Sequence, residues 1–383
     1  MEPMDRKLMN LMLMKRVCFV GEVCSGKGAI SRLCSLPEGK AVLLSGAFAE
    51  RSGFLSRVAA QLEKAGLQTT TVLAEKGEPT LAMIEKHQER ISAAQPDWFI
   101  VVGGGSLLDF GKLAWVLYEH PGFEFSGRAV VPKLRAKSRL VAIPTTAGSG
   151  SEASQAAVLL DASAHRKIPL VSTEWLPDLV ILDPELTVSL PAPVTVSTGF
   201  DAVTHAVEAS VSTFSHPFVR ALAASAVRIL IDALPRVLEH PQDLEARENM
   251  LIAAHLAGLA QSFASTGLAH ALAHAVTAHF GTAHACATSF FLERTMALHA
   301  SKTPGIYSQL ASDAGFHSES ALIDCLRALS HAGTAKSLAE LTRTPLGCDE
   351  LSKLAKSASQ DVCIKTNCCK LTPAEIESFL ASV

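Results

Sequence analysis

The chain has 383 residues, of which 48% are hydrophobic and 19% charged, and its 34 Lys and Arg against 37 Asp and Glu give a net charge of −3. This length suggests roughly two to three domains of about 150 residues each. A hydrophobic content this high excludes a disordered chain. The near-neutral charge argues against a basic nucleic-acid-binding surface, so we expect no nucleic-acid partner.

The cysteines and the N-terminus indicate the compartment. Nine cysteines are an odd number, and no two of them form a CxxC pair, so neither a zinc ribbon nor a dithiol redox motif is supported. We therefore expect a reduced, cytoplasmic protein. Residues 1–15 are Met-rich and basic, but their apolar stretch is short and no small-residue cleavage site follows. They predict an N-terminal extension rather than a signal peptide.

The first half of the chain alternates apolar runs with helical patterns. Strands are predicted over residues 41–45, 69–73, 98–102 and 140–144, and helices over residues 54–65, 81–94 and from the glycines at 103–105 to about 118. Uniformly apolar strands separated by helices indicate a parallel sheet that is covered on both faces. The first half is thus predicted to be an α/β domain.

The pattern changes near Pro191. Beyond it the sequence becomes 3.6-periodic and rich in Ala, Leu and His, which predicts an all-α bundle of seven to nine helices. We place the domain boundary at about residues 185–195, giving domains 1–190 and 191–383. Residues 249–292 contain no Asp, Glu, Lys or Arg, but they hold five histidines, which are costly in lipid. We expect buried helices there, and no membrane partner.

Two polar loops follow predicted strands. Gly103, Gly104, Gly105 and Ser106 stand between a strand and a helix, where glycines allow a phosphate to approach the backbone and the free N–H groups of the helix start. Asp109, three residues later, is predicted to act as a capping-box acid. The second loop, TTAGSGSE at residues 145–152, follows the next strand. Because parallel strands end at one edge of a sheet, both loops predict a single dinucleotide site.

A set of imidazoles and one carboxylate predicts a metal site in the second half. Asp201 and His205 are four residues apart, as are His270 and His274, so each pair shares a helical face. His284 follows fourteen residues after His270. One carboxylate with two or three imidazoles suits Zn(II) or Fe(II). Spacing alone does not choose the ligating histidines, and His279 and His255 stay contenders.

The motifs taken together resemble the iron-containing (group III) alcohol dehydrogenase family. They are GGGSLLDFGK at 103–112, PTTAGSGSE at 144–152, LPDLVILDPEL at 176–186, GFDAVTHAVE at 199–208, and GLAH at 267–270 with His274 and His284. The motifs occur in the same order as in the family, and the match covers roughly residues 17–380. The resemblance implies an N-terminal α/β dinucleotide-binding domain, a C-terminal helical domain, and an active site between them.

The resemblance also implies an activity, NAD(P)-linked hydride transfer between a nicotinamide and a small alcohol or aldehyde at a divalent metal. It assigns the metal, Fe(II) or Zn(II), to Asp201, His205, His270 and His284, and it makes His274 a candidate catalytic residue for proton relay. The residues implied to bind the dinucleotide, which is NAD or NADP, are Gly46, Gly104, Gly105, Ser106, Asp109, Thr145, Thr146, Ser149 and Lys167. A homodimer is expected from the family alone.

Several positions depart from the family pattern. NAD-preferring members commonly carry an Asp where this chain has Gly46, so loss of that charge makes NADP(H) acceptable or preferred. Glu78 stands where relatives such as lactaldehyde reductase have Asn. Three further departures are Ser210, Ala283 and the pair Cys368-Cys369 that replaces Pro-Arg. None of them removes a ligand, but they alter the expected cleft.

Other functions share parts of this pattern. A non-redox lyase resembling dehydroquinate synthase has the same two-domain fold, and a maleylacetate reductase-like, glycerol dehydrogenase-like or phosphonoaldehyde reductase-like specificity fits within the redox class. A non-catalytic metal- or nucleotide-binding module is a third class. The intact metal ligands and the segment 144–152 favour the dehydrogenase. The sequence names no substrate.

Overall fold

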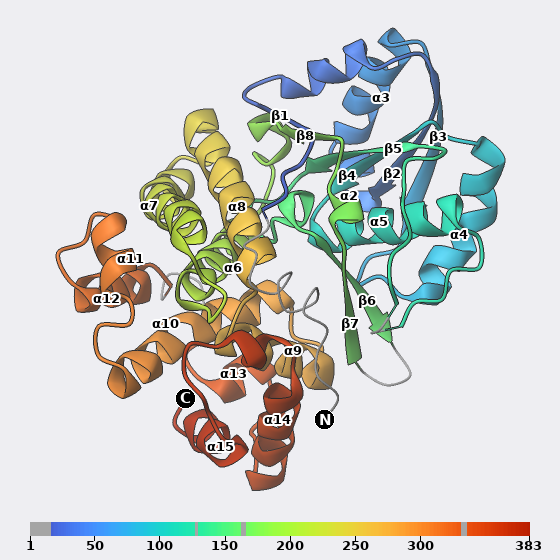
Figure 1. Ribbon diagram of the computed structural model, residues 1–383. Coiled ribbons are helices and arrows are strands. Elements are labelled where there is room, and N and C mark those ends of the chain that lie inside the picture. Colours follow the sequence, from blue (N-terminus) through green and yellow to red (C-terminus); the bar gives the residue numbers. More distant parts are fainter. Residues whose placement is uncertain (1–16, 127–128, 162–165, 331–334) are drawn as a thin grey trace, which may run out of the picture.

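The computed structural model describes residues 17–126, 129–161, 166–330 and 335–383, and the predicted N-terminal extension lies outside them. Figure 1 shows two parts, one built around a sheet and one built of helices. The sheet part comes first in the chain. Only helices and their connections follow from Ala192 onward in the described residues, so the composition change near Pro191 coincides with the start of a helix.

Six strands, all paired in parallel, form the sheet in the order β1-β8-β5-β4-β2-β3. The predicted parallel sheet is therefore confirmed. β1 and β8 have four residues each and are not predicted from the sequence, because so short a run carries little periodicity. The strands are β1 (Glu22–Ser25), β2 (Gly39–Gly46), β3 (Leu67–Ala74), β4 (Trp98–Gly103), β5 (Arg139–Pro144) and β8 (Leu179–Leu182).

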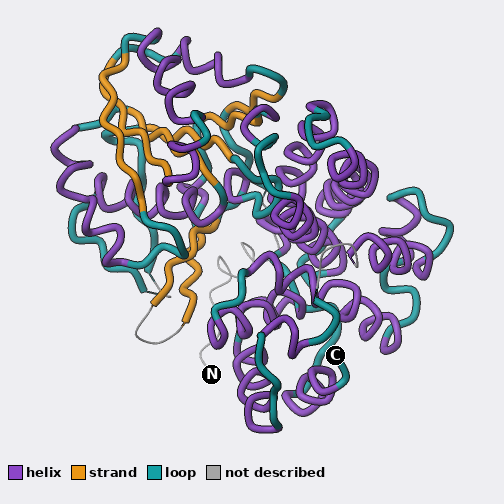
Figure 2. Tube along the Cα trace, turned by 180° about the vertical axis from the view of Figure 1, so that it is seen from behind, coloured by secondary structure: helices purple, strands orange, loops and turns teal. Residues whose placement is uncertain are grey.

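Alternate residues of the central strands are buried on opposite faces of the sheet. Val42 and Val101 pack in the cluster that contains α4 (Leu81–Ala94) and α5 (Gly105–Glu119). Leu43 and Ile100 pack on the other face with α3 (Phe54–Lys64) and the 3-10 helix η1 (Ala29–Ser35). Figure 2 shows helices on both sides of the strands. Burial on both faces explains why these strands are uniformly apolar.

A two-stranded antiparallel hairpin is added to the sheet part. Its strands are β6 (Ala156–Asp161) and β7 (Arg166–Val171), and neither is predicted from the sequence pattern. β6 packs on α5, while β7 reaches the helical part and contacts α9 (Leu268–Phe280). The remaining short elements of this part are α2 (Ala47–Arg51), η2 (Ser151–Ala153), η3 (Thr173–Trp175) and η4 (Pro184–Leu186).

The helical part contains ten α-helices in the described residues, more than the seven to nine predicted. The excess arises because α11 and α13 have only six and five residues and show no clear period. Besides α9 the helices are α6 (Ala192–Val211), α7 (Pro217–Glu239), α8 (Leu244–Ala264), α10 (His284–Lys302), α11 (Ser308–Asp313), α12 (Glu319–Ser330), α13 (Leu338–Thr342), α14 (Cys348–Gln360) and α15 (Pro373–Ala381), with the 3-10 helix η5 (Cys363–Thr366).

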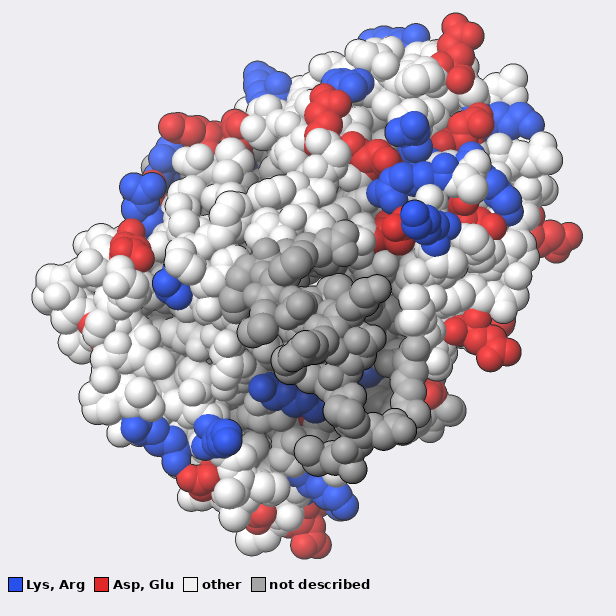
Figure 3. All heavy atoms as spheres, in the orientation of Figure 1, with Lys and Arg blue, Asp and Glu red and all other residues white. Residues whose placement is uncertain are grey.

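The charge-free stretch at residues 249–292 forms most of α8, all of α9 and the start of α10. Within the described ranges, no single helix has the length and hydropathy of a membrane span. α8 and α9 meet that criterion only together, and the chain bends by 99° between them. On the face drawn in Figure 3, basic and acidic side chains lie interspersed over the sheet part, in keeping with the near-zero net charge.

The two parts meet where the loop after β5 touches α8. Gly150 has a left-handed φ of +60°, and a Cβ built on it would lie 2.5 Å from the Cα of Gly258. The side chain of Gln261 donates a hydrogen bond to the carbonyl oxygen of Ser149 (2.9 Å). Two backbones in such close contact need glycine on both sides. This contact fixes the position of the helical part relative to the edge of the sheet.

We predict that Gly150→Ala lowers the thermal unfolding midpoint much more than Gly53→Ala does. Gly53 also has a left-handed φ, +78°, but nothing lies within 4 Å of its Cβ position, so that change adds only backbone strain of about 1 kcal/mol. At Gly150 the overlap with α8 adds about 1–3 kcal/mol. Differential scanning calorimetry of both variants measures the difference, and equal midpoints would show that the contact is not needed.

Candidate active site

The first glycine segment ends β4 and begins α5. Gly104 is the residue before the helix, and the backbone of this turn comes so close to the second loop that a Cβ on Gly105 would lie 2.5 Å from the hydroxyl oxygen of Ser149. The amide of Thr145 donates to the carbonyl oxygen of Gly103 (3.0 Å). The structure thus places both loops side by side at one edge of the sheet, where the first N–H groups of α5 have no intrahelical acceptor.

Asp109 holds the second loop instead of capping α5. No side chain caps this helix, so the expected capping box does not form. The Asp109 carboxylate instead accepts hydrogen bonds from the hydroxyl of Ser151 (2.5 Å) and the amide of Val158 (3.1 Å). It cannot reach back to the helix start because it lies beyond the first turn, on the side that faces the loop.

Lys112, one turn further along α5, supports the same loop. Its buried ammonium group donates to the carbonyl oxygens of Ser151 (2.7 Å), Ser154 (3.0 Å) and Ala156 (2.8 Å). Burial lowers the pKa of Lys112 to about 8, although the charge of Asp109 opposes the shift. The lysine belongs to the GGGSLLDFGK motif, but nothing in its spacing indicates this role.

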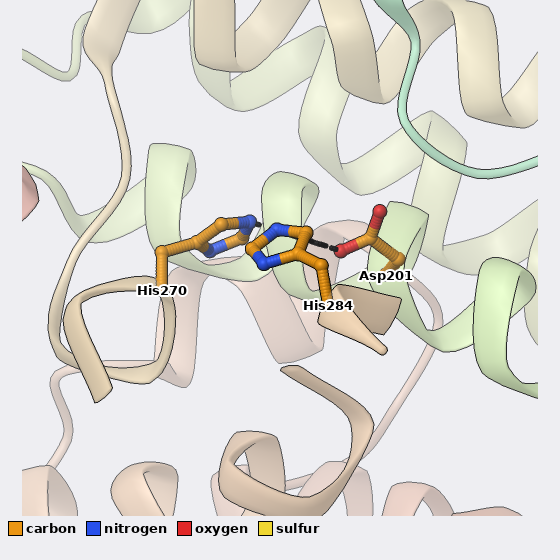
Figure 4. Close-up of side chains that lie close together, drawn as sticks. All are labelled: Asp201, His270 and His284. Atoms are coloured by element: carbon orange, nitrogen blue, oxygen red, sulfur yellow. Dashed lines mark ion pairs between the residues drawn. The ribbon is translucent and has the colours of Figure 1, made fainter. Parts of the chain in front are cut away.

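Three of the four predicted metal ligands come together on three helices. The carboxylate oxygen Oδ1 of Asp201 on α6 lies 3.9 Å from Nε2 of His270 on α9 and 3.8 Å from Nε2 of His284 on α10. One ligand atom of each residue lies within 4.8 Å of the others. Figure 4 shows the three side chains pointing toward one another. Asp201 is oriented further by the hydroxyl of Thr288, which donates to its Oδ1 (2.8 Å).

His205 lies next to this group but is not one of the three. Its ring stacks on the ring of His270 with centroids 4.4 Å apart, and its Nδ1 is buried without a hydrogen-bond partner. Burial lowers the pKa of His205 to about 4, against the opposing effect of the Asp201 charge. The other two contenders are elsewhere, because His255 bonds Glu152 and His279 is exposed.

The donor set fits a divalent metal ion. Nε2 of His270 and Nδ1 of both His205 and His284 are buried and have no hydrogen-bond partner. Burying such a nitrogen without a partner costs free energy, and a cation beside Asp201 would remove that cost at Nε2 of His270, the unpartnered nitrogen that faces the carboxylate. Burial, followed by the charges of Lys167 and the neighbouring histidines, keeps the pKa of His284 well below its ordinary value. His284 is therefore neutral, which is the form that binds metals.

Glu208, on α6, positions His270. Its carboxylate accepts hydrogen bonds from the amides of Gly267 (2.9 Å) and Ala269 (2.6 Å) and from Nδ1 of His270 (2.6 Å). Burial opposes the charge, yet these bonds lower the pKa of Glu208, so the group is ionised. With its Nδ1–H donated, His270 presents Nε2 to the ion. A carboxylate behind a ligating imidazole is the usual partner that fixes its tautomer.

His274 is held by a residue that sequence reasoning missed. Nδ1 of His274 lies 2.9 Å from Oδ2 of Asp361, and its ring stacks on His284 with centroids 5.1 Å apart. Burial opposes ionisation of Asp361, but the hydrogen bond and charge of His274 lower its pKa. Because 87 residues separate the pair, no local spacing could have found it.

Three other predicted dinucleotide-binding residues lie in the sheet part. Gly46 ends β2, Ser106 is exposed at the start of α5, and Lys167 pairs with Glu78.

Comparison with known proteins agrees with this architecture. The sequence profile of iron-containing alcohol dehydrogenases matches residues 21–184, and the profile of the C-terminal part of the Fe-containing alcohol dehydrogenase family matches residues 195–383. An NADPH-dependent butanol dehydrogenase of Clostridium saccharobutylicum is 34% identical over 78% of this chain and 77% of its own length. A probable alcohol dehydrogenase, EutG, of Salmonella typhimurium is 32% identical over 88% of this chain and 85% of its own.

Solved structures show the same likeness. A 1,3-propanediol oxidoreductase superposes with a TM-score of 0.89 at 26% identity, covering 96% of this chain and 99% of its own. An iron-containing alcohol dehydrogenase of Thermococcus thioreducens gives 0.88 at 29% identity over the same shares of the two chains. The fold and the relatives define an alcohol oxidoreductase. This chain belongs to the iron-containing alcohol dehydrogenase family, and its activity is that of a metal-dependent, NAD(P)-linked alcohol dehydrogenase.

We predict that Glu208→Gln weakens metal binding by about 10–100-fold, because a carboxamide cannot accept from all three donors and leaves His270 free to turn. Competition with a chelator of known affinity measures the effect. Glu293→Gln is the matched control, since Glu293 is also buried on a helix but pairs with Arg294 and Arg327. A Glu208→Gln protein that binds metal as tightly as the unchanged protein would contradict this role.

Proposed function

We propose that this chain interconverts a short alcohol and its aldehyde at a metal held by Asp201, His205, His270 and His284, with Fe(II) or Zn(II) as the ion. The single observation that supports the site most strongly is the group of Asp201, His270 and His284, in which Nε2 of each histidine lies within 4 Å of one carboxylate oxygen of Asp201. When bound, the metal polarises the substrate oxygen, and the nicotinamide gives or takes the hydride.

The chain's own residues would bind and orient the reactants. Backbone N–H groups at the start of α5, beside Gly104, Gly105 and Ser106, would hold the dinucleotide phosphates, because a helix N-terminus attracts an anion. Thr145, Thr146 and Ser149 would line the adjoining loop, and Asp109 keeps that loop in place. Lys167 would lie at the nicotinamide end, since the strand that carries it, β7, contacts α9, the helix of His270 and His274.

His274 would move the proton. Asp361 accepts the hydrogen bond at Nδ1, so Nε2 is the nitrogen of His274 that can take up or release a proton. A carboxylate behind an imidazole fixes which nitrogen carries the proton. The role fits general acid–base catalysis, in which a positioned group transfers a proton to or from the reacting oxygen.

Two substitutions separate these roles. His270→Ala should lose most metal and most turnover while keeping its circular dichroism spectrum, because one ligand is removed and the helices persist. His274→Gln should keep its metal and lose about 10²–10⁴-fold in kcat, the usual contribution of a proton-transferring group. Metal analysis and steady-state rates of aldehyde reduction measure both effects. Full activity of metal-free His270→Ala protein would refute the metal assignment, and an unchanged kcat in His274→Gln would refute the relay.

We propose that NADP(H) is preferred over NAD(H). No carboxylate stands at Gly46, and nothing lies within 4 Å of its Cβ position, so there is neither charge nor bulk to oppose a 2′-phosphate. β2 and β4 pair in parallel up to Ser45 and Val102, which puts Gly46 at the same edge as the glycine segment. Among the relatives, the butanol dehydrogenase is NADPH-dependent and a methanol dehydrogenase of Bacillus methanolicus is NAD-dependent.

Gly46→Asp should reverse this preference. A phosphate monoester carries about −1.5 to −2 charges at pH 7, so an adjacent carboxylate repels it, whereas a ribose hydroxyl is tolerated. We expect the ratio of kcat/KM with NADPH to that with NADH to fall by at least about tenfold. Gly46→Asn adds similar bulk without the charge and is the control. A strong NADH preference of the unchanged protein would overturn the proposal.

We further propose domains 1–190 and 191–383, a homodimer and a cytoplasmic location. The profile matches end and begin at residues 184 and 195, on either side of the proposed boundary. The dimer rests on family resemblance, and sedimentation equilibrium tests it. Nine free cysteines favour a reducing compartment, which fractionation tests.

A further inference from the structure

Lys167, which the proposed function places at the nicotinamide end, forms an ion pair with Glu78, a residue to which that function gives no role. Nζ of Lys167 on β7 lies 3.1 Å from Oε1 of Glu78, in the connection between β3 and α4. The Lys167 side chain is 10% exposed and that of Glu78 26% exposed, so solvent screens this pair only in part. The connection is also fixed by its backbone, since the amide of Leu160 on β6 donates to the carbonyl oxygen of Pro79 (2.8 Å).

The pair reaches both the metal cluster and the glycine loops. Lys167 stands opposite Leu160 in the hairpin, and the amide of Val158, on the same strand as Leu160, donates to the Asp109 carboxylate (3.1 Å) beneath the loops. Burial raises the pKa of Asp109 beneath the loops, and the negative charge of Glu78 adds to that shift. β7 contacts α9, the helix that carries His270 and His274. The positive charge of Lys167 therefore acts on a substrate held beside His284. The carboxylate of Glu78 offsets part of that charge.

We infer that Glu78 is a specificity-determining residue: by neutralising Lys167 it makes the site select uncharged alcohols and aldehydes over those that carry a carboxylate, sulfonate or phosphonate. The inference rests on the proposed function and names its substrate class. An unpaired ammonium group in a partly buried site would attract an anion, whereas a paired one offers an anion no net attraction and leaves it facing a carboxylate.

Charge can be separated from structure with three variants. Glu78→Gln removes the negative charge and keeps an amide oxygen that can accept from Lys167. Lys167→Gln removes the positive charge, and the double variant restores a neutral pair. Butanal and 4-oxobutanoate are the matched probes, because they differ only in whether the far end of the chain is a methyl group or a carboxylate.

The expected measure is the ratio of kcat/KM for 4-oxobutanoate to that for butanal, with saturating NADPH and protein of known metal content. Glu78→Gln should raise this ratio about tenfold, in line with one partly screened unit charge. Lys167→Gln should lower it, and the double variant should return it toward the starting value. Calorimetric binding of succinamate against butyramide, which do not react, should follow the same order.

A control variant is available at another Lys–Glu pair. Glu375→Gln removes a carboxylate that pairs with Lys302, at the end of α10 and about 27 Å along that helix from His284. It should leave the ratio unchanged. If Glu78→Gln changes only the melting temperature, or only the KM for NADPH, the pair has a structural or a cofactor-binding role and the inference is wrong. If the unchanged protein reduces neither aldehyde, the proposed function itself fails.

Discussion

The arrangement of the site depends on one buried carboxylate. Glu208 stands on α6 seven residues after Asp201, and it accepts both amides at the start of α9 and the ring of His270. One group thereby sets where α9 begins, which tautomer His270 adopts and how far His270 lies from Asp201. An ionised group in the interior is tolerated only because all three donors are present. Asn367 completes this junction by accepting from the amide of Leu268 (3.0 Å).

The sheet part is positioned against the helical part by close contacts at glycines and not by a buried charge. Gly105 approaches the side chain of Ser149, and Gly150 approaches the backbone of Gly258, so the two loops and α8 are in close contact at glycines. Because the proposed metal ligands come from α6, α9 and α10, this contact sets how far they lie from the glycine segment 103–105. The Glu78–Lys167 pair joins the connection after β3 to the hairpin, whose strand β7 contacts α9.

Much of this could be predicted from the sequence, for identifiable reasons. β4 and α4 carry long, clear patterns and are found nearly to the residue. Spacing indicates a metal site without choosing its histidines, and the family resemblance selects Asp201, His270 and His284, which the fold brings together. The hairpin of β6 and β7 escapes prediction because its strands are only half buried and of mixed polarity. Glu208, Thr288 and Asp361 act on partners 59–87 residues away, and such pairings depend on tertiary contacts that no local pattern encodes.

Lys112 has a consequence of a different kind. Its ammonium group sits among three carbonyl oxygens much as a potassium ion sits in a ring of such oxygens elsewhere. The loop after β5 is thus braced by a covalently attached cation, which no chelator can extract. Removing a metal from the histidine cluster would therefore leave this brace in place.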